Sequence, residues 1–128
     1  MSALQADTVN DELERCREWL EAAMARGAHT HEWEDIINGV LDGRYHFWSS
    51  DDAALLTEFV YYPRAQYVHV FLAGGNLDKI MDMRDSVERF AQGYGFDGVS
   101  MTGRRGWVRA LGDHGYDEGL TVVTKTFE

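Results

Sequence analysis

Hydrophobic residues recur at the spacing of one helical face in the first third of the chain. The first such stripe consists of Val9, Leu13, Cys16 and Leu20. Gly27 follows it, and glycine is common just beyond helix ends, so we expect an amphipathic helix within residues 1–27. A second stripe of the same spacing predicts another helix before Gly43. Its members are Trp33, Ile36, Ile37, Val40 and Leu41.

From residue 44 the hydrophobic period changes to two. Three runs rich in aromatic and β-branched residues cover 45–48, 55–62 and 67–73. A Ser-Ser-Asp-Asp turn separates the first two runs, and Pro63, which would interrupt strand pairing, precedes the third. The pattern predicts an antiparallel meander of three strands.

Helical spacing returns after the Gly-Gly-Asn turn at residues 74–76, and a short strand over 98–102 follows the predicted helix. A strand, a crossover helix and another strand normally form a parallel pair, so we expect this part of the sheet to be parallel. Residues 107–114 have room for a short helix, and 120–127 alternate as a closing strand. The predicted order is ααβββαβαβ, an α/β (α+β) fold in which helices flank one mixed central sheet.

Length and charge narrow the classes of function. The 128 residues suit a single domain, 1–128, and they include 22 acidic against 12 basic side chains, for a net charge of −10. Such a field repels phosphate backbones, so we expect no nucleic-acid partner. No apolar run reaches membrane-spanning length and the opening residues do not resemble a signal peptide, so we expect a cytoplasmic protein without a membrane partner.

Metal binding is not expected either. Cys16 is the only cysteine, which excludes an intrachain disulfide and a zinc site built from cysteines. His29 and His31 lie close to Glu32 and Glu34, but residues two apart point to different sides of a helix. We therefore predict no metal ligands.

Residues 103–116, Gly-Arg-Arg-Gly-Trp-Val-Arg-Ala-Leu-Gly-Asp-His-Gly-Tyr, carry a family resemblance together with the predicted element order. The chain resembles the GNAT superfamily of acyl-CoA-dependent N-acyltransferases. More narrowly, its Tyr-Pro-Arg, Leu-Ala-Gly-Gly and Thr-Gly-Arg-Arg-Gly-Trp segments resemble small GNAT-like proteins of tailed bacteriophages. The resemblance covers residues 30–128, which makes the helix within 1–27 an addition before the family core.

The resemblance implies a place for acetyl-CoA. In the family, the strand that corresponds to 67–73 splays from its parallel neighbour and its backbone binds pantetheine, while the next turn and helix N-terminus bind pyrophosphate. The implied cofactor-binding residues are Phe71, Leu72, Ala73, Gly74, Gly75, Asn76 and Leu77.

Two features depart from the family pattern. The turn at 74–76 is several residues shorter than the family's loop and contains no basic residue, and Asp78 would repel a diphosphate in the first helical turn. Leu111 occupies the position, four residues before Gly115, where many members carry a tyrosine that protonates the departing thiolate. Leucine cannot donate a proton, and we expect Leu111 to belong to the core.

Glu58 and His69 are the candidates for a general base that would deprotonate an acceptor amine. Strand alternation allows either to face a cleft, and a half-buried carboxyl or imidazole can have its pKa moved toward neutrality. The plainer alternative is that each is a solvated strand residue or the partner of a neighbouring tyrosine.

Two surface features invite further interpretation. Arg104, Arg105 and Arg109 concentrate positive charge that would suit a phosphate of CoA or a carboxylate of a partner protein, and we favour the protein contact. Trp19 lies off the apolar stripe of its helix, where it would serve as an exposed interaction anchor.

These observations lead to two functional hypotheses, and they leave open whether the protein is an enzyme. In the first, a GNAT-like protein of phage type with a degraded acyl-CoA site needs no cofactor. It binds a protein partner or itself in virion assembly or as a virion component, in the host cytoplasm or the virion. In the alternative, the protein is an acetyl-CoA-dependent N-acetyltransferase that acts on a primary amine by direct transfer, with Glu58 or His69 as the base.

Overall fold

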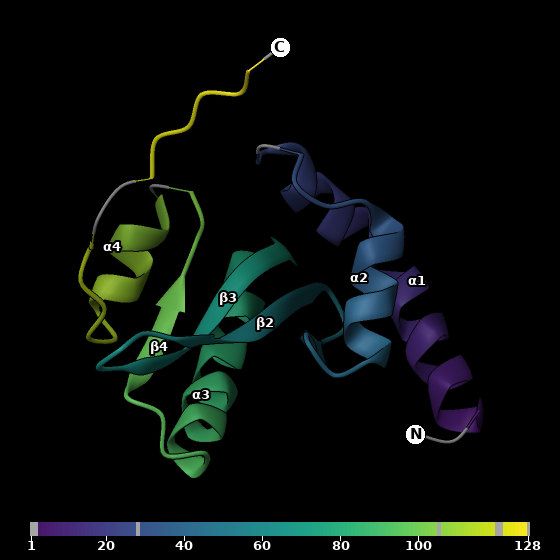
Figure 1. Ribbon diagram of the computed structural model, residues 1–128, viewed down its shortest axis with the longest axis horizontal. Helices are drawn as coiled ribbons and strands as arrows, with labels where there is room; N and C mark the ends of the chain where they lie inside the picture. The colour runs from purple at the N-terminus through teal and green to yellow at the C-terminus, as the bar shows by residue number, and fades with distance from the viewer. Residues whose placement is uncertain (1–2, 28, 105, 120–121, 128) are drawn as a thin grey trace.

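Among the residues that the structure describes, four helices and a four-stranded sheet make up the fold (Figure 1). The computed structural model describes residues 3–27, 29–104, 106–119 and 122–127. In chain order the elements are α1 (Ala3–Ala25), α2 (Trp33–Leu41), β1 (His46–Ser49), β2 (Ala53–Tyr61), β3 (Gln66–Gly75), α3 (Leu77–Gly93), β4 (Gly98–Met101) and α4 (Gly106–Gly112).

The sheet has the mixed topology that the sequence predicts. Its strands lie in the order β1-β2-β3-β4, with antiparallel pairing from β1 to β3 and parallel pairing between β3 and β4. α3 makes the crossover between the two parallel strands. The predicted meander and the predicted parallel pair are both confirmed.

Hydrophobic clusters cover both faces of the sheet. One joins α1 and α2 to one face, with Leu13, Cys16 and Leu20 from α1 packed on Ala54 and Leu56 of β2. The other joins α3 to the opposite face; its fully buried members include Leu55, Val68, Val70 and Val87. Strand alternation explains why adjacent residues of β2 contribute to opposite clusters.

Helix α2 begins one residue after Glu32. The Glu32 backbone N–H donates to Oδ2 of Asp35 at 2.9 Å, which satisfies a donor that the helix itself leaves free. At the other end, Gly43 has a φ of +85°, the left-handed region that favours glycine. The helix that the sequence predicts before Gly43 is therefore confirmed.

The predicted closing strand over 120–127 does not form in the described residues 122–127, which have no strand structure. Val122, Val123 and Phe127 are 83%, 87% and 84% exposed. Alternation alone does not form a strand, because the segment must also pair with a sheet edge, and residues 122–127 do not. Residues 120, 121 and 128 lie outside the described part.

Trp19 does not have the exposed position that the sequence predicts. Its side chain is half-buried against the cluster beneath α1, and the Arg15 guanidinium lies 5.5 Å from the centre of its ring. The backbone of Trp19 also lies against Gly74 of β3. A residue off the main stripe of α1 therefore contacts the sheet because β3 extends beneath the helix.

Candidate functional site

The parallel strands β3 and β4 separate partway along the sheet. Their pairing runs from Tyr67 opposite Gly98 to Val70 opposite Met101, and the last backbone bond runs from Thr102 N–H to the Val70 carbonyl at 3.0 Å. Beyond this point β3 continues to Gly75, whereas β4 has ended. In the described part of the chain, residues 72–75 therefore have a strand partner on the β2 side only, and Phe71 is paired on neither side.

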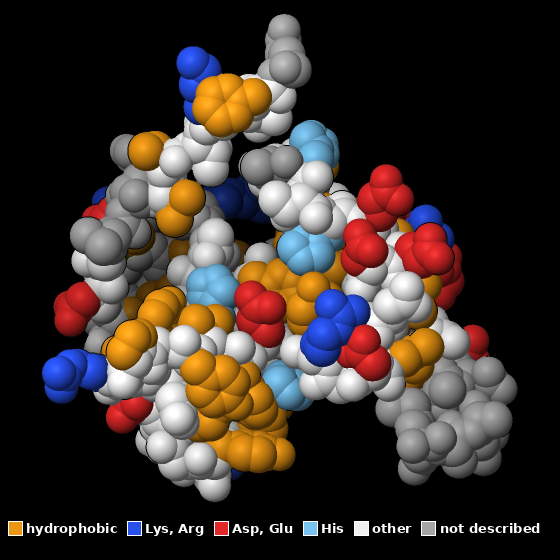
Figure 2. All heavy atoms as spheres, in the orientation of Figure 1, with side chains coloured by type: hydrophobic (Ala, Val, Ile, Leu, Met, Phe, Trp, Pro, Cys, Tyr) orange, Lys and Arg blue, Asp and Glu red, His pale blue; other side chains and the backbone are white. Residues whose placement is uncertain are grey.

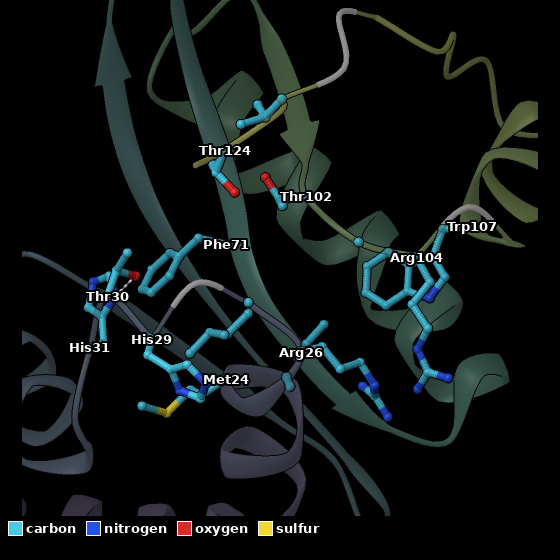
Figure 3. Close-up of a pocket in the computed structure, with 16 residues that line it drawn as sticks. Met24, Arg26, His29, Thr30, His31, Phe71, Thr102, Arg104, Trp107 and Thr124 are labelled. Atoms are coloured by element: carbon cyan, nitrogen blue, oxygen red, sulfur yellow. Dashed lines mark hydrogen bonds between the residues drawn. The ribbon is translucent and has the colours of Figure 1, made fainter. Parts of the chain in front are cut away.

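A cavity of about 620 Å³ opens at this separation (Figure 3). Phe71, Leu72 and Ala73 line it from β3, and Thr102 and Trp107 line it from the chain after β4. The end of α1, the loop to α2, and Val122 and Thr124 near the C-terminus form the rest of the wall. The volume lies within the ordinary range of small-molecule sites. Three of the seven predicted cofactor-binding residues therefore border one cavity.

A bulge in β3 places Phe71 at this cavity. Leu56 of β2 lies opposite Leu72, but the next residue, Thr57, lies opposite Val70, so Phe71 is an extra residue in the pairing. Its ring lies 5.7 Å from that of His31 and 4.7 Å from that of Tyr45. The bulge depends on pairing with β2, and no local signal in the sequence predicts it.

The other four predicted cofactor-binding residues lie away from the cavity lining. A Cβ atom on Gly74 would overlap the carbonyl oxygen of Trp19, and Gly75 has a φ of +102° and lies against the Asp52 carbonyl. The Asn76 N–H donates to that carbonyl at 2.9 Å, and its side chain accepts from the Lys79 N–H at 3.3 Å as the cap of α3. The four residues are Gly74, Gly75, Asn76 and Leu77.

This arrangement explains both glycines without a ligand. Gly74 allows α1 to approach β3 closely, and Gly75 adopts a backbone conformation that other residues rarely tolerate. Asp78 lies in the first turn of α3, where its carboxylate interacts favourably with the helix dipole.

Glu58 and His69, the two candidate bases, lie opposite each other on β2 and β3. Their alternation with Leu56 and Phe71 places both on the sheet face that α1 and α2 partly cover. His69 is half-buried, and the desolvation that comes with burial lowers its pKa, an effect that the nearby Glu58 carboxylate partly opposes. Burial therefore favours the neutral form of the His69 side chain, which is the form that can accept a proton.

Two hydroxyl groups bind the His69 ring. Its Nδ1 lies 2.7 Å from Ser100 Oγ, and its Nε2 lies 2.9 Å from Thr102 Oγ1. A neutral imidazole donates a hydrogen bond through one nitrogen and accepts one through the other. One of these two hydroxyls therefore donates a hydrogen bond to the ring, and the other accepts one from it. Thr102 also lines the cavity, which connects His69 to it. Ser100 and Thr102 were not predicted as site residues, although both belong to the short strand segment that the sequence predicts beside β3.

Leu111 and the three arginines at 104, 105 and 109 are the remaining residues that the sequence analysis singled out. Leu111 is 6% exposed and belongs to the core, as predicted, so no proton donor occupies that position. Arg104 lines the cavity, Arg109 is exposed on α4, and Arg105 lies outside the described residues.

Within the described residues, no three His, Cys, Asp or Glu side chains gather as a metal site. Nor does any described helix combine the length and hydropathy needed to cross a bilayer.

Several solved structures share this fold. A possible acetyltransferase from Clostridium difficile 630 matches with a TM-score of 0.63 at 9% identity, over 92% of each chain. An aminoglycoside acetyltransferase, meta-AAC0020, from an uncultured soil metagenomic sample was solved with sisomicin; it matches with a TM-score of 0.63 at 10% identity, over 92% of this chain and 90% of its own. Wild-type TTHA1254 from Thermus thermophilus matches with a TM-score of 0.59 at 16% identity, over 89% of this chain and 91% of its own.

No protein-family model matches the chain, and no curated protein matches its sequence. Identities of 9%, 10% and 16% establish the fold rather than the activity. With its meander, its parallel crossover and its separating strands, the chain has the mixed α/β fold of GNAT-like acetyltransferases.

Proposed function

We propose that the protein is an acetyl-CoA-dependent N-acetyltransferase that acts on a primary amine by direct transfer. The observation that carries this proposal is the cavity at the separation of β3 from β4, which Thr102 connects to His69. Proteins whose names describe acetyltransferases share the fold over nearly the whole chain, which supports the same class of reaction here. It is the second of the two hypotheses that the sequence supports.

The residues at the cavity fit an acyl thioester with a pantetheine arm. Phe71, Leu72 and Ala73 border the cavity where β3 has left β4, so their backbone groups on that side are available to an extended ligand. When bound, acetyl-CoA supplies an activated acetyl group. The acidic surface, red in Figure 2, would attract a cationic amine toward the site.

His69 is the base in this proposal. As the new C–N bond forms and the thioester C–S bond breaks, the amine nitrogen loses a proton, which passes through the Thr102 hydroxyl to His69 Nε2. The neutral state of His69 prepares it to accept that proton. Leu111 offers no proton to the departing thiolate, which takes one from solvent. Glu58 lies next to His69 but does not line the cavity, so we assign it no direct proton transfer.

Release of free CoA in the presence of acetyl-CoA and primary amines tests the reaction. We expect His69→Gln to lower kcat by about 10²- to 10⁴-fold while changing the KM for acetyl-CoA little, the usual range for loss of a general base. Glu58→Gln should retain most of the activity. His114→Gln, a change at an exposed histidine outside this cavity, is the matched control.

The proposal would be wrong if the wild-type protein showed no change in melting temperature at millimolar acetyl-CoA. A ligand present at 100 times its Kd stabilises the fold by about 2.7 kcal/mol, which a melting curve resolves easily. Equal activity of the His69→Gln and His114→Gln variants would remove His69 as the base without removing the activity itself.

A protein-binding role is the second candidate, and an exposed aromatic cluster favours it. Tyr61 and Tyr94 are 64% and 62% exposed and pack on Phe59 and Phe96 near the C-terminal end of α3, where Figure 2 shows hydrophobic side chains gathered. Exposed aromatic side chains are common anchors of protein interfaces. A role in virion assembly or as a virion component rests on the sequence resemblance to phage proteins.

Sedimentation of wild-type protein and of the Tyr61→Ser and Tyr94→Ser variants tests this second candidate. Self-association that the substitutions abolish would support a binding role. A monomer that also fails to co-purify with any partner, and that binds acetyl-CoA, would exclude it.

A further inference from the structure

Two arginine side chains line the cavity from different parts of the chain. Arg26 follows the last residue of α1, and Arg104 lies in the segment between β4 and α4. Figure 3 shows both guanidinium groups extending toward the same end of the cavity, away from the Phe71 ring. Arg26 and Arg104 are 78 positions apart in the sequence, so it is the tertiary structure that brings these two cations to one cavity.

Neither guanidinium has a partner among the described residues, for no ion pair or hydrogen bond joins either to a side chain or carbonyl there. By contrast, Arg15, Arg17, Arg44, Arg84 and Arg89 each form an ion pair with a carboxylate, and Arg64 and Arg109, which also form none among the described residues, do not line this cavity. The contrast matters in a chain with 22 acidic and 12 basic side chains, where carboxylates are plentiful. Two unpaired arginines that share one cavity wall are suited to an external anion.

The turn before α3, which the family resemblance assigns to phosphate, is not suited to it. The Trp19 backbone covers Gly74, the Asn76 side chain already accepts from the Lys79 N–H, and Asp78 adds a negative charge. This turn does not border the cavity that Phe71, Leu72 and Ala73 line.

From these observations we infer that a phosphate group of the acyl-CoA substrate binds between Arg26 and Arg104. This inference rests on the proposed function and deepens it. The thioester end would lie near Thr102, and the phosphates would lie at the arginine end of the same cavity. A planar guanidinium can donate two parallel hydrogen bonds to phosphate oxygens, and two guanidinium groups compensate the charge of a diphosphate or of the ribose phosphate.

Titration calorimetry with acetyl-CoA, S-acetylpantetheine, dephospho-CoA and inorganic pyrophosphate tests the site. We expect Arg26→Gln and Arg104→Gln each to weaken acetyl-CoA binding about tenfold or more, and to leave the affinity for the phosphate-free S-acetylpantetheine unchanged. Arg104→Lys should bind acetyl-CoA with intermediate affinity because it keeps the charge and loses the two-pronged geometry. Arg64→Gln, at an exposed and unpaired arginine in the described β2–β3 turn, is the matched control.

The outcomes separate the site from the proposed function. If Arg26→Gln and Arg104→Gln both bind acetyl-CoA with wild-type affinity, the phosphate site is wrong and the transferase proposal stands. The same conclusion follows if the two variants lose equal affinity for acetyl-CoA and for S-acetylpantetheine. Pyrophosphate binding that needs both arginines, without any acetyl-CoA binding, would support the anion site and overturn the transferase proposal. Absence of binding to every probe would overturn both. If dephospho-CoA binds both variants as tightly as it binds the wild-type protein, the arginines contact the ribose phosphate rather than the diphosphate.

Discussion

Gly74 lies so close to Trp19 that a Cβ atom at position 74 would overlap the Trp19 backbone carbonyl. This contact seats α1 directly on the end of β3, just before α3 begins. The same contact buries Gly74, whereas Gly75, Asn76 and Leu77 of the following turn are exposed. Position 74 therefore requires glycine for the packing of α1 on β3, with no ligand needed to explain it.

Gly74→Ala should destabilise the fold. The added methyl group meets backbone rather than a flexible side chain, and overpacking of this kind commonly costs about 1–3 kcal/mol in the free energy of unfolding. Urea unfolding measures the change. Gly93→Ala, at the end of α3 where a Cβ would meet nothing within 4 Å, should leave stability unchanged or raise it by up to about 1 kcal/mol. Equal stability of the two variants would contradict the contact.

Stability should rise with pH between about 5.5 and 7. Burial lowers the pKa of both His46 and His69 in the folded state, so at a pH near the ordinary histidine value of 6.5 the unfolded chain binds more protons. The stability that neutral histidines provide is present above 6.5 and is lost as pH falls toward their folded pKa values. Glu12, with a pKa lowered to about 2, titrates below this window.

Urea unfolding at several pH values measures this dependence. His69→Gln should reduce its slope because one of the two histidines is removed. A free energy of unfolding that stayed constant from pH 5.5 to 7 in the wild-type protein would show that burial does not perturb these groups.

The Cys16 thiol should be unreactive in the folded protein. Its side chain is fully buried, and burial raises its pKa, so little thiolate forms and no reagent reaches it. Reaction with a chromogenic disulfide should be at least about a hundredfold slower in native buffer than in concentrated urea, because it requires opening of the core. Rapid native labelling would contradict the position of Cys16 beneath α1. If Cys16 does not react in native buffer, the thiol that the same reagent detects in a transferase assay is released CoA and not the protein.

Arg15 should contribute to stability more than other surface arginines. Its guanidinium donates to the Ser50 and Asp51 carbonyls at 2.7 and 3.1 Å, and to Glu12, which also accepts from Ser49 Oγ at 2.8 Å. These bonds attach α1 to the turn between β1 and β2. Arg15→Met should therefore lower the urea midpoint of unfolding, because four hydrogen bonds of the guanidinium are lost together.

The control for Arg15 is Arg89→Met. Arg89 forms an exposed pair with Asp85 within α3, and exposed helical pairs of this spacing contribute little to stability. The urea midpoint of the Arg89 variant should stay close to that of the wild-type protein. If the Arg89 variant lost as much stability as the Arg15 variant, the anchoring role of Arg15 would be wrong.

Local patterns predicted most of the elements because hydrophobic spacing reflects which face of each helix or strand is buried. The stripe from Val9 to Leu20 and the alternation in 55–62 correspond to α1 and β2. The closing strand over 120–127 is the main error in the described region, since alternation in the sequence does not ensure that a sheet edge receives the segment. The candidate site was predicted in part: His69 and Phe71 lie at or beside the cavity, whereas Ser100 and Arg26 were missed.

Periodicity and residue type were enough to predict the element order as far as α4, the mixed sheet, the apolar stripe that contains Cys16 and the absence of a proton donor at Leu111. These properties depend on periodicity and residue type, which a single chain displays directly. Three further features became visible in the folded chain alone: α1 lies against Gly74, a bulge places Phe71 at the cavity, and Arg26 and Arg104 share the cavity wall. Each of these features depends on contacts between segments that are distant in the chain. The local spacing of hydrophobic residues does not predict such contacts.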